Sequence, residues 1–159
     1  MAPRVGIGYD SHRFADGERL VLGGVQIEHE RGLTGHSDAD VLTHAVIDAL
    51  LGACGLGDLG ELFPDSEEQW RDADSIDLLR VVVGRLTGAV SNVDVTVICE
   101  EPKLAPYKAE ISSLLAGVLS APVSVKASTN EGMGAIGRGE GIACMAVVLV
   151  DTGEELERA

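Results

Sequence analysis

Three side chains in the first third of the sequence have the types and the spacing of a metal site. Asp10 and His12 stand two residues apart at the end of a strand-like stretch, so both side chains leave the strand on one face. His44 lies in an otherwise apolar segment of helical periodicity. One carboxylate and two imidazoles are a common ligand set for a catalytic zinc, which keeps a fourth position open. The pattern predicts zinc, although Asp-x-His pairs also arise by chance and nothing in the spacing brings His44 to the strand end.

The predicted helix around His44 carries further polar residues. Asp40, His44 and Asp48 follow one another at four-residue intervals and therefore share one face. Either acid would be able to accept a hydrogen bond from His44 and orient its ring. Ser37 is expected to cap the helix, with Asp40 three residues later as in a capping box, and Gly55 is expected to end it.

A second group of chemically capable residues follows a predicted strand in the last third of the chain. Ser128-Thr129-Asn130-Glu131 leads into a glycine-dense segment, 132–141, which contains Arg138. Hydroxyls and backbone amides can donate to phosphate, and a carboxylate binds a hard cation such as Mg²⁺. Arg138 between two glycines suits a phosphate or, equally, a structural ion pair. On composition alone, an ordinary glycine-rich loop explains the same residues.

The elements that must position these groups alternate between strands and helices. We expect strands over 4–9, 93–97, 123–127 and 142–150, a hairpin of 20–22 with 25–27, and helices over 41–53, 75–86 and 106–119. The hairpin and the adjacent helices do not fit a doubly wound sheet. The expected fold is therefore α+β: a two-layer sandwich of a mixed β-sheet with helices on one face, plus a small hairpin.

Composition limits the partners of this chain. At 159 residues we expect a single domain over 1–159, with a mobile tail from about residue 152. The net charge of −14 argues against nucleic acid and anionic membranes, and any phosphate site must gather positive charge locally. Three cysteines in apolar runs, without a C-x-x-C pair, indicate a reducing compartment. No leader or membrane span is recognisable, so the expected location is cytoplasmic.

Taken together and in order, these motifs resemble the 2-C-methyl-D-erythritol 2,4-cyclodiphosphate synthase family of the non-mevalonate isoprenoid pathway. The resemblance covers nearly the whole chain, and each motif is weak on its own. The matching segments are Gly8-Tyr9-Asp10-Ser11-His12, His36-Ser37-Asp38-Ala39-Asp40 with His44, 56–60, Phe63-Pro64-Asp65, 92–96, Pro102-Lys103, 126–131 and 137–143.

The resemblance implies an enzyme, a phosphorus–oxygen lyase that works as a homotrimer with active sites between subunits. It implies zinc on Asp10, His12 and His44, and magnesium or manganese on Glu131. The substrate would be 4-diphosphocytidyl-2-C-methyl-D-erythritol 2-phosphate. Its 2-phosphate would attack the β-phosphorus of its own diphosphate, closing the cyclic diphosphate and expelling CMP.

The resemblance also assigns roles to individual positions. His36 and Thr129 match the positions thought to stabilise the transition state. Pro102 and Lys103, from a neighbouring subunit, would receive the cytidine, largely through backbone groups. The erythritol part would be held by Ser37, Asp58, Leu59, Gly60, Phe63, Pro64 and Asp65. The remaining substrate-contacting positions are Asp10, His12, Ser128, Asn130, Glu131 and Arg138.

Two departures from the family pattern matter. Ala135 stands where many members have an aromatic residue, which puts in doubt a hydrophobic pocket for isoprenoid diphosphates near Arg138 on the trimer axis. Ser128-Thr129-Asn130 replaces a more threonine-rich run but keeps the hydroxyl of Thr129. Two other functions would use the same residues: a zinc phosphoesterase that activates water, and a non-catalytic trimeric module that binds nucleotides through its glycine-rich loops.

Overall fold

The computed structural model describes residues 2–35 and 37–153. The strands are β1 (Ala2–Asp16), β2 (Leu20–Leu22), β3 (Val25–Ile27), β4 (Arg31–Thr34), β5 (Gly88–Ile98), β6 (Val123–Ser128) and β7 (Gly141–Thr152). The helices are α1 (Val41–Cys54), α2 (Leu59–Leu62), α3 (Ser75–Val83), α4 (Lys108–Leu119) and α5 (Gly134–Gly137), with a 3₁₀ turn at Glu68–Trp70.

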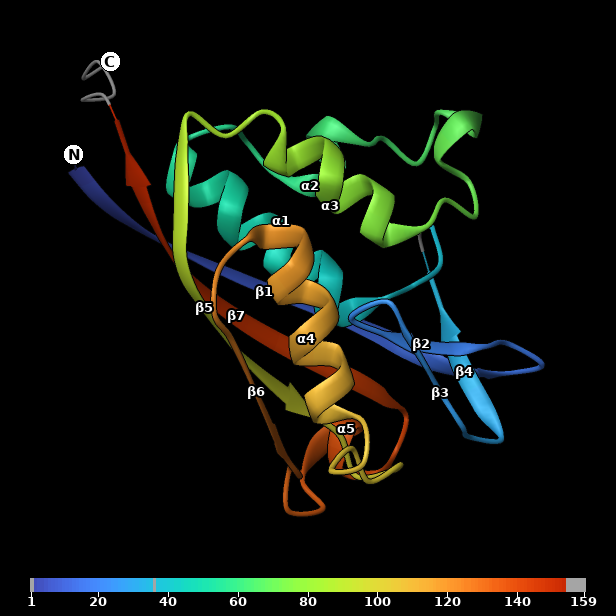
Figure 1. Cartoon of the computed structure of the whole chain (residues 1–159). Helices are drawn as coiled ribbons and strands as arrows, with labels where there is room; N and C mark the ends of the chain where they lie inside the picture. The colour runs from blue at the N-terminus through green and yellow to red at the C-terminus, as the bar shows by residue number, and fades with distance from the viewer. Residues whose placement is uncertain (1, 36, 154–159) are drawn as a thin grey trace.

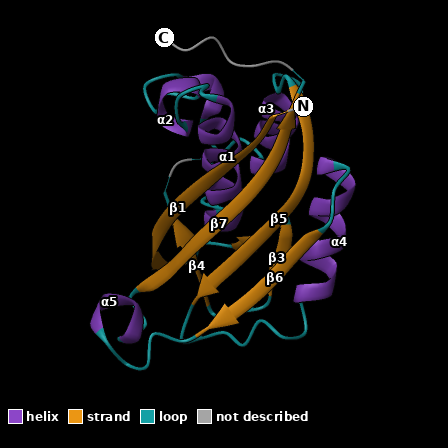
Figure 2. Cartoon of the chain, turned by 90° about the vertical axis from the view of Figure 1, so that its left-hand side faces the viewer, coloured by secondary structure: helices purple, strands orange, loops and turns teal. Residues whose placement is uncertain are grey.

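The strands form a five-stranded sheet in the order β4-β1-β7-β5-β6 and a separate β2-β3 hairpin. Only β5 and β6 run parallel, so the sheet is mixed. Helices α1, α3 and α4 lie on one face of it, as Figure 1 and Figure 2 show. The predicted α+β two-layer sandwich with a small hairpin is therefore confirmed. No helix in the described part of the chain is both long and apolar enough to cross a bilayer.

Helix α1 lies directly on strand β1 because β1 has glycines where it faces the helix. A Cβ atom at Gly6 would stand 1.9 Å from the carbonyl oxygen of Ala49, and one at Gly8 would stand 1.9 Å from that of Ala45. Any side chain at either position would push the helix away. The close approach matters because Asp10 and His12 continue the same face of β1, while His44 belongs to the same turn of α1 as Ala45.

Asp40, not Ser37, is the N-cap of α1, so the expected capping box at Ser37 is wrong. The Asp40 carboxylate accepts hydrogen bonds from the amides of Thr43, Gly23 and Gly24 and from the Thr43 hydroxyl. One buried carboxylate thus ties the helix start to the β2-β3 turn, which outweighs the local preference for serine. The predicted hairpin at Gly23-Gly24 and the stop at Gly55, which adopts a left-handed conformation, are both confirmed.

Strand β7 extends further than the sequence pattern indicates. Thr152 is buried, pairs with Ala2 and Gly88 in the sheet, and donates its hydroxyl to the Ala2 carbonyl at 3.0 Å. Residue 152 is therefore part of the sheet rather than the start of a tail. The rest of the expected tail, residues 154–159, lies outside the described residues.

The face of the sheet opposite the helices is open and partly apolar. Val5 and Ile7 are 68% and 69% exposed, and Tyr9 continues their row along β1. Met145 and Val147 of β7 pair with Tyr9 and Ile7 and are exposed beside them. A row of this kind on a sheet face is typical of a surface that another chain covers.

Candidate functional site

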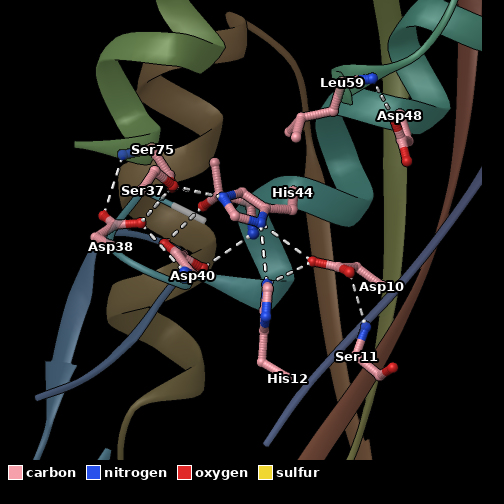
Figure 3. Close-up of polar contacts among 12 residues, drawn as sticks. Asp10, Ser11, His12, Ser37, Asp38, Asp40, His44, Asp48, Leu59 and Ser75 are labelled. Atoms are coloured by element: carbon pink, nitrogen blue, oxygen red, sulfur yellow. Dashed lines mark hydrogen bonds and ion pairs between the residues drawn. The ribbon is translucent and has the colours of Figure 1, made fainter. Parts of the chain in front are cut away.

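Three donor atoms meet between β1 and α1, as the sequence predicts. Asp10 Oδ2 lies 2.9 Å from His12 Nε2 and 3.1 Å from His44 Nδ1, and the two imidazole nitrogens are 3.2 Å apart (Figure 3). The second oxygen of Asp10 accepts a hydrogen bond from the Ser11 amide at 2.9 Å, which fixes the carboxylate. His44, which the spacing could not connect to the strand end, is brought there by the packing of α1 on β1.

The dimensions of this triangle fit a metal ion. Tetrahedral zinc with bonds of about 2.05 Å holds its ligand atoms about 3.3 Å apart, close to the separations of 2.9 to 3.2 Å found here. Within the described residues, these three form a group that could hold a metal ion, a carboxylate with two imidazoles. His44 is buried, whereas Asp10 and His12 remain partly exposed, so the cluster opens towards solvent on one side.

The short distances within the triad also shift the pKa values of Asp10 and His44. Burial alone would raise the pKa of Asp10, but hydrogen bonds and charge from His12 and His44 outweigh it and hold that pKa below its ordinary value. Burial alone would lower the pKa of His44, but the hydrogen bond to Asp10 and the charges of Asp40, Asp10 and Asp38 raise it. The carboxylates around His44 therefore favour a positive charge at this point, which is the environment that a bound cation needs.

Two serines contact the other ring nitrogen of His44, a role that the sequence analysis gave to Asp40 or Asp48. His44 Nε2 lies 2.9 Å from Ser37 Oγ and 3.0 Å from Ser75 Oγ. Asp40 is occupied at the helix cap, and Asp48 accepts the Leu59 amide at 2.8 Å instead, as Figure 3 shows. The prediction that an acid of the α1 stripe orients His44 is therefore wrong, because both acids satisfy backbone donors.

Ser75 sets the tautomer of His44. Its hydroxyl donates to Asp38 Oδ1 and its amide donates to Asp38 Oδ2 at 3.0 Å, so the Ser75 oxygen is left to accept a hydrogen bond. The network therefore places a proton on Nε2, so Nδ1, which hydrogen-bonds Asp10 and faces His12, is the nitrogen left to bind a metal once it gives up its own proton. In the sequence, Ser75 is distinguished only as the start of a helix, so nothing there reveals this contact.

A glycine also shapes the position of His12. A Cβ atom at Gly35 would stand 2.3 Å from His12 Nδ1, so the strand end at β4 closes against the imidazole ring. His36, the next residue and one of the two predicted transition-state groups, lies outside the described residues.

A cavity of about 360 Å³ adjoins Ser37 and is lined by Gly35, Asp65, Arg71 and Asp72. It lies where the resemblance places the erythritol part, and Arg71 adds a cation that the sequence analysis did not single out. The cavity brings together Ser37 and Asp65 among the predicted residues.

The remaining predicted residues of the 58–65 loop have structural contacts of their own. Asp58 caps α2 by accepting the Glu61 amide, and the Leu59 amide is held by Asp48. Gly60 is exposed and Pro64 is half-buried. Phe63 is buried and packs edge-on against Trp70 at 4.9 Å between ring centroids, so its side chain belongs to the core and is not available to a ligand.

A second pocket, of about 200 Å³, lies at the ends of β5 and β6. Pro102, Lys103, Ser128 and Thr129 line it together with Cys99 and Lys108. Two of the three lysines in the sequence therefore stand at one pocket of an otherwise acidic chain. Burial raises the pKa of the Cys99 thiol to about 11, so this sulfur is a neutral wall of the pocket.

The loop that follows Thr129 turns back sharply. Glu131 is exposed in a left-handed conformation, and the Met133 amide donates to the Asn130 carbonyl at 2.9 Å across the turn. Arg138 donates from Nε to Glu140 at 2.7 Å, and this pairing lowers the pKa of Glu140. The guanidinium is mostly exposed, so it has the structural ion pair foreseen as one alternative and can still reach a ligand.

The two regions occupy one row of the sheet but are far apart within a single chain. Asp10 pairs with Cys144, Cys144 with Val97, and Val97 with Ala127. Three strand spacings separate β1 from β6, which amounts to about 14 Å. The triad and the lysine-lined pocket are therefore not one site within one copy of the chain.

Comparison with known proteins extends over almost the whole sequence. The model of the YgbB family matches residues 3–151. The chain is 55% identical over 155 residues to the 2-C-methyl-D-erythritol 2,4-cyclodiphosphate synthase of Salinibacter ruber, covering 94% of this chain and 99% of that protein. A similarly named protein of Syntrophomonas wolfei is also 55% identical, over 93% of this chain and 98% of its own length.

Solved structures agree with the sequence comparison. The bifunctional IspDF of Campylobacter jejuni superposes with a TM-score of 0.91 at 40% identity, covering 96% of this chain and 43% of that one. The CDP complex of Plasmodium falciparum IspF superposes with a TM-score of 0.83 at 32% identity, covering 96% and 98%. With the same fold, a matching family model and high identity over full length, this chain belongs to the YgbB family of 2-C-methyl-D-erythritol 2,4-cyclodiphosphate synthases.

Proposed function

We propose that this protein converts 4-diphosphocytidyl-2-C-methyl-D-erythritol 2-phosphate to 2-C-methyl-D-erythritol 2,4-cyclodiphosphate and CMP, as a phosphorus–oxygen lyase of the non-mevalonate isoprenoid pathway. The observation that carries the proposal is the triangle of Asp10, His12 and His44, with His44 Nδ1 aimed at its two partners. This donor set stands in a chain 55% identical to proteins of that name.

In this reaction both reacting groups belong to one substrate. The protein therefore needs no nucleophile of its own, and holding the 2-phosphate and the diphosphate in line supplies much of the rate. Asp10, His12 and His44 would hold zinc, and Glu131 would hold magnesium or manganese. When bound, such cations polarise the diphosphate and neutralise its charge.

The remaining residues bind and orient. Thr129 lines the pocket and its hydroxyl accepts the Glu131 amide at 3.3 Å; with His36 it is our choice for stabilising charge in the transition state. Lys103 and Lys108 give the pocket a positive potential suited to a nucleoside diphosphate.

Other residues would contact the two ends of the substrate. Those at the nucleotide would be Pro102, Ser128 and Asn130. Those at the erythritol would be Ser37, Asp65 and the 58–64 backbone. Arg138 would reach a phosphate from its flexible mount.

We propose that the protein works as a homotrimer. The exposed row of Val5, Ile7 and Tyr9 on the open face of the sheet favours burial against another copy. A neighbouring copy would also bring its lysine-lined pocket to the metal triad, which a single chain holds about 14 Å away across the sheet.

The cytoplasm is the proposed location, since all three cysteines are buried and unpaired and the net charge of −14 does not favour a nucleic acid or membrane partner. We also take 1–159 as one functional domain, supported by a single hydrophobic cluster that includes residues from Phe14 to Val150.

Incubation of the zinc-loaded protein with the cytidine substrate and Mg²⁺, followed by ³¹P NMR, tests the proposal. The expected products are CMP and the cyclic diphosphate in equal amounts. Release of inorganic phosphate from simple phosphate esters would point to a phosphoesterase instead. Tight CDP binding with the substrate left intact would point to a non-catalytic nucleotide-binding module.

A further inference from the structure

Glu131 stands in an unusual backbone conformation that needs an explanation. Its φ angle is +51°, and Gly132 follows at +72°, so both central residues of the turn from Asn130 to Met133 are left-handed. This is the geometry of a type I′ turn, which strongly prefers asparagine, aspartate or glycine at its first central position. A glutamate there is strained and is retained only where its surroundings hold it.

The carboxylate of Glu100 provides that hold. One of its oxygens, Oε1, accepts hydrogen bonds from the Asn130 amide at 2.9 Å and from the Gly132 amide at 3.3 Å. The amide between them, that of Glu131, is directed to Thr129 Oγ1 at 3.3 Å. Three successive amides therefore converge on side-chain oxygens, in the kind of concave backbone arrangement that otherwise binds a free anion.

The two loops are joined by their backbones as well. Glu100 lies two residues after the end of β5, and the Cys99 amide between them donates to the Ser128 carbonyl at 2.9 Å, which places Glu100 beside the end of β6. At the far side of the turn, Asn130 Nδ2 donates to the Met133 carbonyl at 2.7 Å. Removing the Glu100 contact would leave the Asn130 and Gly132 amides without their protein acceptor and release the strained residue between them.

We propose that Glu100 is a positioning residue, which locks the turn through these two amides and so presents the Glu131 carboxylate and the Thr129 hydroxyl to the diphosphate and its second cation. The inference rests on the proposed function in taking Glu131 as a ligand of that cation. It gives Glu100 a role distinct from that of Glu131, since Oε1 of Glu100 is taken up by two backbone amides.

Two substitutions of Glu100 distinguish the length of its side chain from its negative charge. Glu100→Gln loses the charge but keeps an oxygen at the same distance, so it should retain the turn. Glu100→Asp keeps the charge but is one methylene too short to reach both amides. We expect Glu100→Asp to raise the Mg²⁺ concentration for half-maximal activity about 10-fold, with little change in kcat at saturating Mg²⁺. Glu100→Gln and the exposed neighbour control Glu101→Gln should stay within about twofold of the parent protein.

A binding measurement complements the kinetics. Mn²⁺ affinity in the presence of CDP, followed by electron paramagnetic resonance, should fall about 10-fold in Glu100→Asp only, while zinc content stays unchanged in every variant. If Glu100→Gln were as impaired as Glu100→Asp, or if neither were impaired, the positioning role would be overturned. A parallel Glu131→Gln variant identifies the cause: no effect of Glu131→Gln contradicts the proposed cation site, whereas an effect of Glu131→Gln without one of Glu100→Asp contradicts this inference alone.

Discussion

The triad of Asp10, His12 and His44 and the loop over 129–138 differ in how completely the chain builds them. His44 is buried among Ser37, Ser75 and Asp10, on a helix pressed against strand β1. Glu131 and Arg138 are exposed on a loop at the end of the sheet, and their backbone is fixed by a few hydrogen bonds. The triad is therefore set by folding itself. The loop is shaped by folding but left open, as expected of groups that close only around a ligand or a second chain.

The triad and the pocket lined by Lys103 and Lys108 also differ in how positive charge is provided in an acidic protein. At the triad, the carboxylates of Asp10, Asp38 and Asp40 surround His44 and raise its pKa, an environment that favours a cation. At the pocket, the charge comes from Lys103 and Lys108. Substitutions in the two regions should accordingly have different consequences: loss of the metal or of the fold on one side, and a changed requirement for Mg²⁺ on the other.

The largest effect is expected from His44→Ala. Removing one of three metal ligands should abolish stoichiometric zinc binding, measured by plasma mass spectrometry, and lower turnover at least about 10³-fold, because the Lewis acid contributes several kcal/mol to the transition state. His29→Gln is the control, since its ring packs against Phe14 and not in the triad. Undiminished turnover of His44→Ala in metal-free buffer would contradict the zinc assignment.

Gly8→Ala should disrupt the triad indirectly, because it displaces the helix that carries His44. The new Cβ atom would meet the Ala45 carbonyl at 1.9 Å, so α1 must move away from β1, and we expect the free energy of unfolding to fall by about 2–4 kcal/mol in urea titrations. Gly52→Ala on the same helix is the matched control. It has open space around its Cβ and should raise stability by about 0.5–1 kcal/mol. Equal effects of both substitutions would argue against the described contact between α1 and β1.

Ser75→Ala should have a smaller effect, confined to metal affinity. Without the acceptor that fixes the Nε2 proton, zinc binding should weaken about 10-fold, since Ser37 remains as a second partner. Competition with a chromogenic chelator measures this, and ¹⁵N NMR of the metal-free protein, at a pH above the raised pKa of His44, should show the neutral ring losing its preference for the Nε2–H tautomer. Ser124→Ala, on an exposed position of β6, should change neither quantity. An unchanged tautomer in Ser75→Ala would refute the role of the serine.

Glu131→Gln should have an effect no larger than that of Ser75→Ala, and the one most specific to the loop. Replacing a charged oxygen ligand by a neutral amide should raise the Mg²⁺ requirement about 10-fold while leaving zinc content and unfolding free energy unchanged. The measurement is a magnesium titration of CMP release at fixed zinc. A titration identical to that of the parent protein would remove Glu131 from the cation site.

Much of the fold could be predicted because the responsible patterns are local. The Gly23-Gly24 turn, the apolar face of α1 and the alternation in β5 and β6 can be read directly from neighbouring residues, and all are confirmed. Errors arose where hydrogen-bond partners were chosen across the fold. Ser37 has the composition of a helix cap, yet Asp40 takes that place because it also satisfies two amides of the hairpin.

The same limit applies to the site. The sequence indicates Asp10 and His12 as a pair because strand periodicity puts them on one face, but it contains no sign that Ser75 contacts His44 or that Glu100 holds the turn of Glu131. These contacts join residues 30 or more positions apart. No period of 2 or 3.6 residues records such distances, so only the packed structure reveals them.

By itself, the sequence determined which groups this protein has for chemistry: an Asp-x-His strand end, a histidine on an apolar helix, and a hydroxyl, a carboxylate and glycines after a strand. The order of its motifs determined the family as well. The tertiary structure decided which of these groups meet. It did so through Gly6 and Gly8, whose missing side chains let α1 lie against β1 and bring His44 to Asp10 and His12. Close packing of α1 on β1 depends on the shapes of both elements together, and the sequence of β1 alone describes only one of these two shapes.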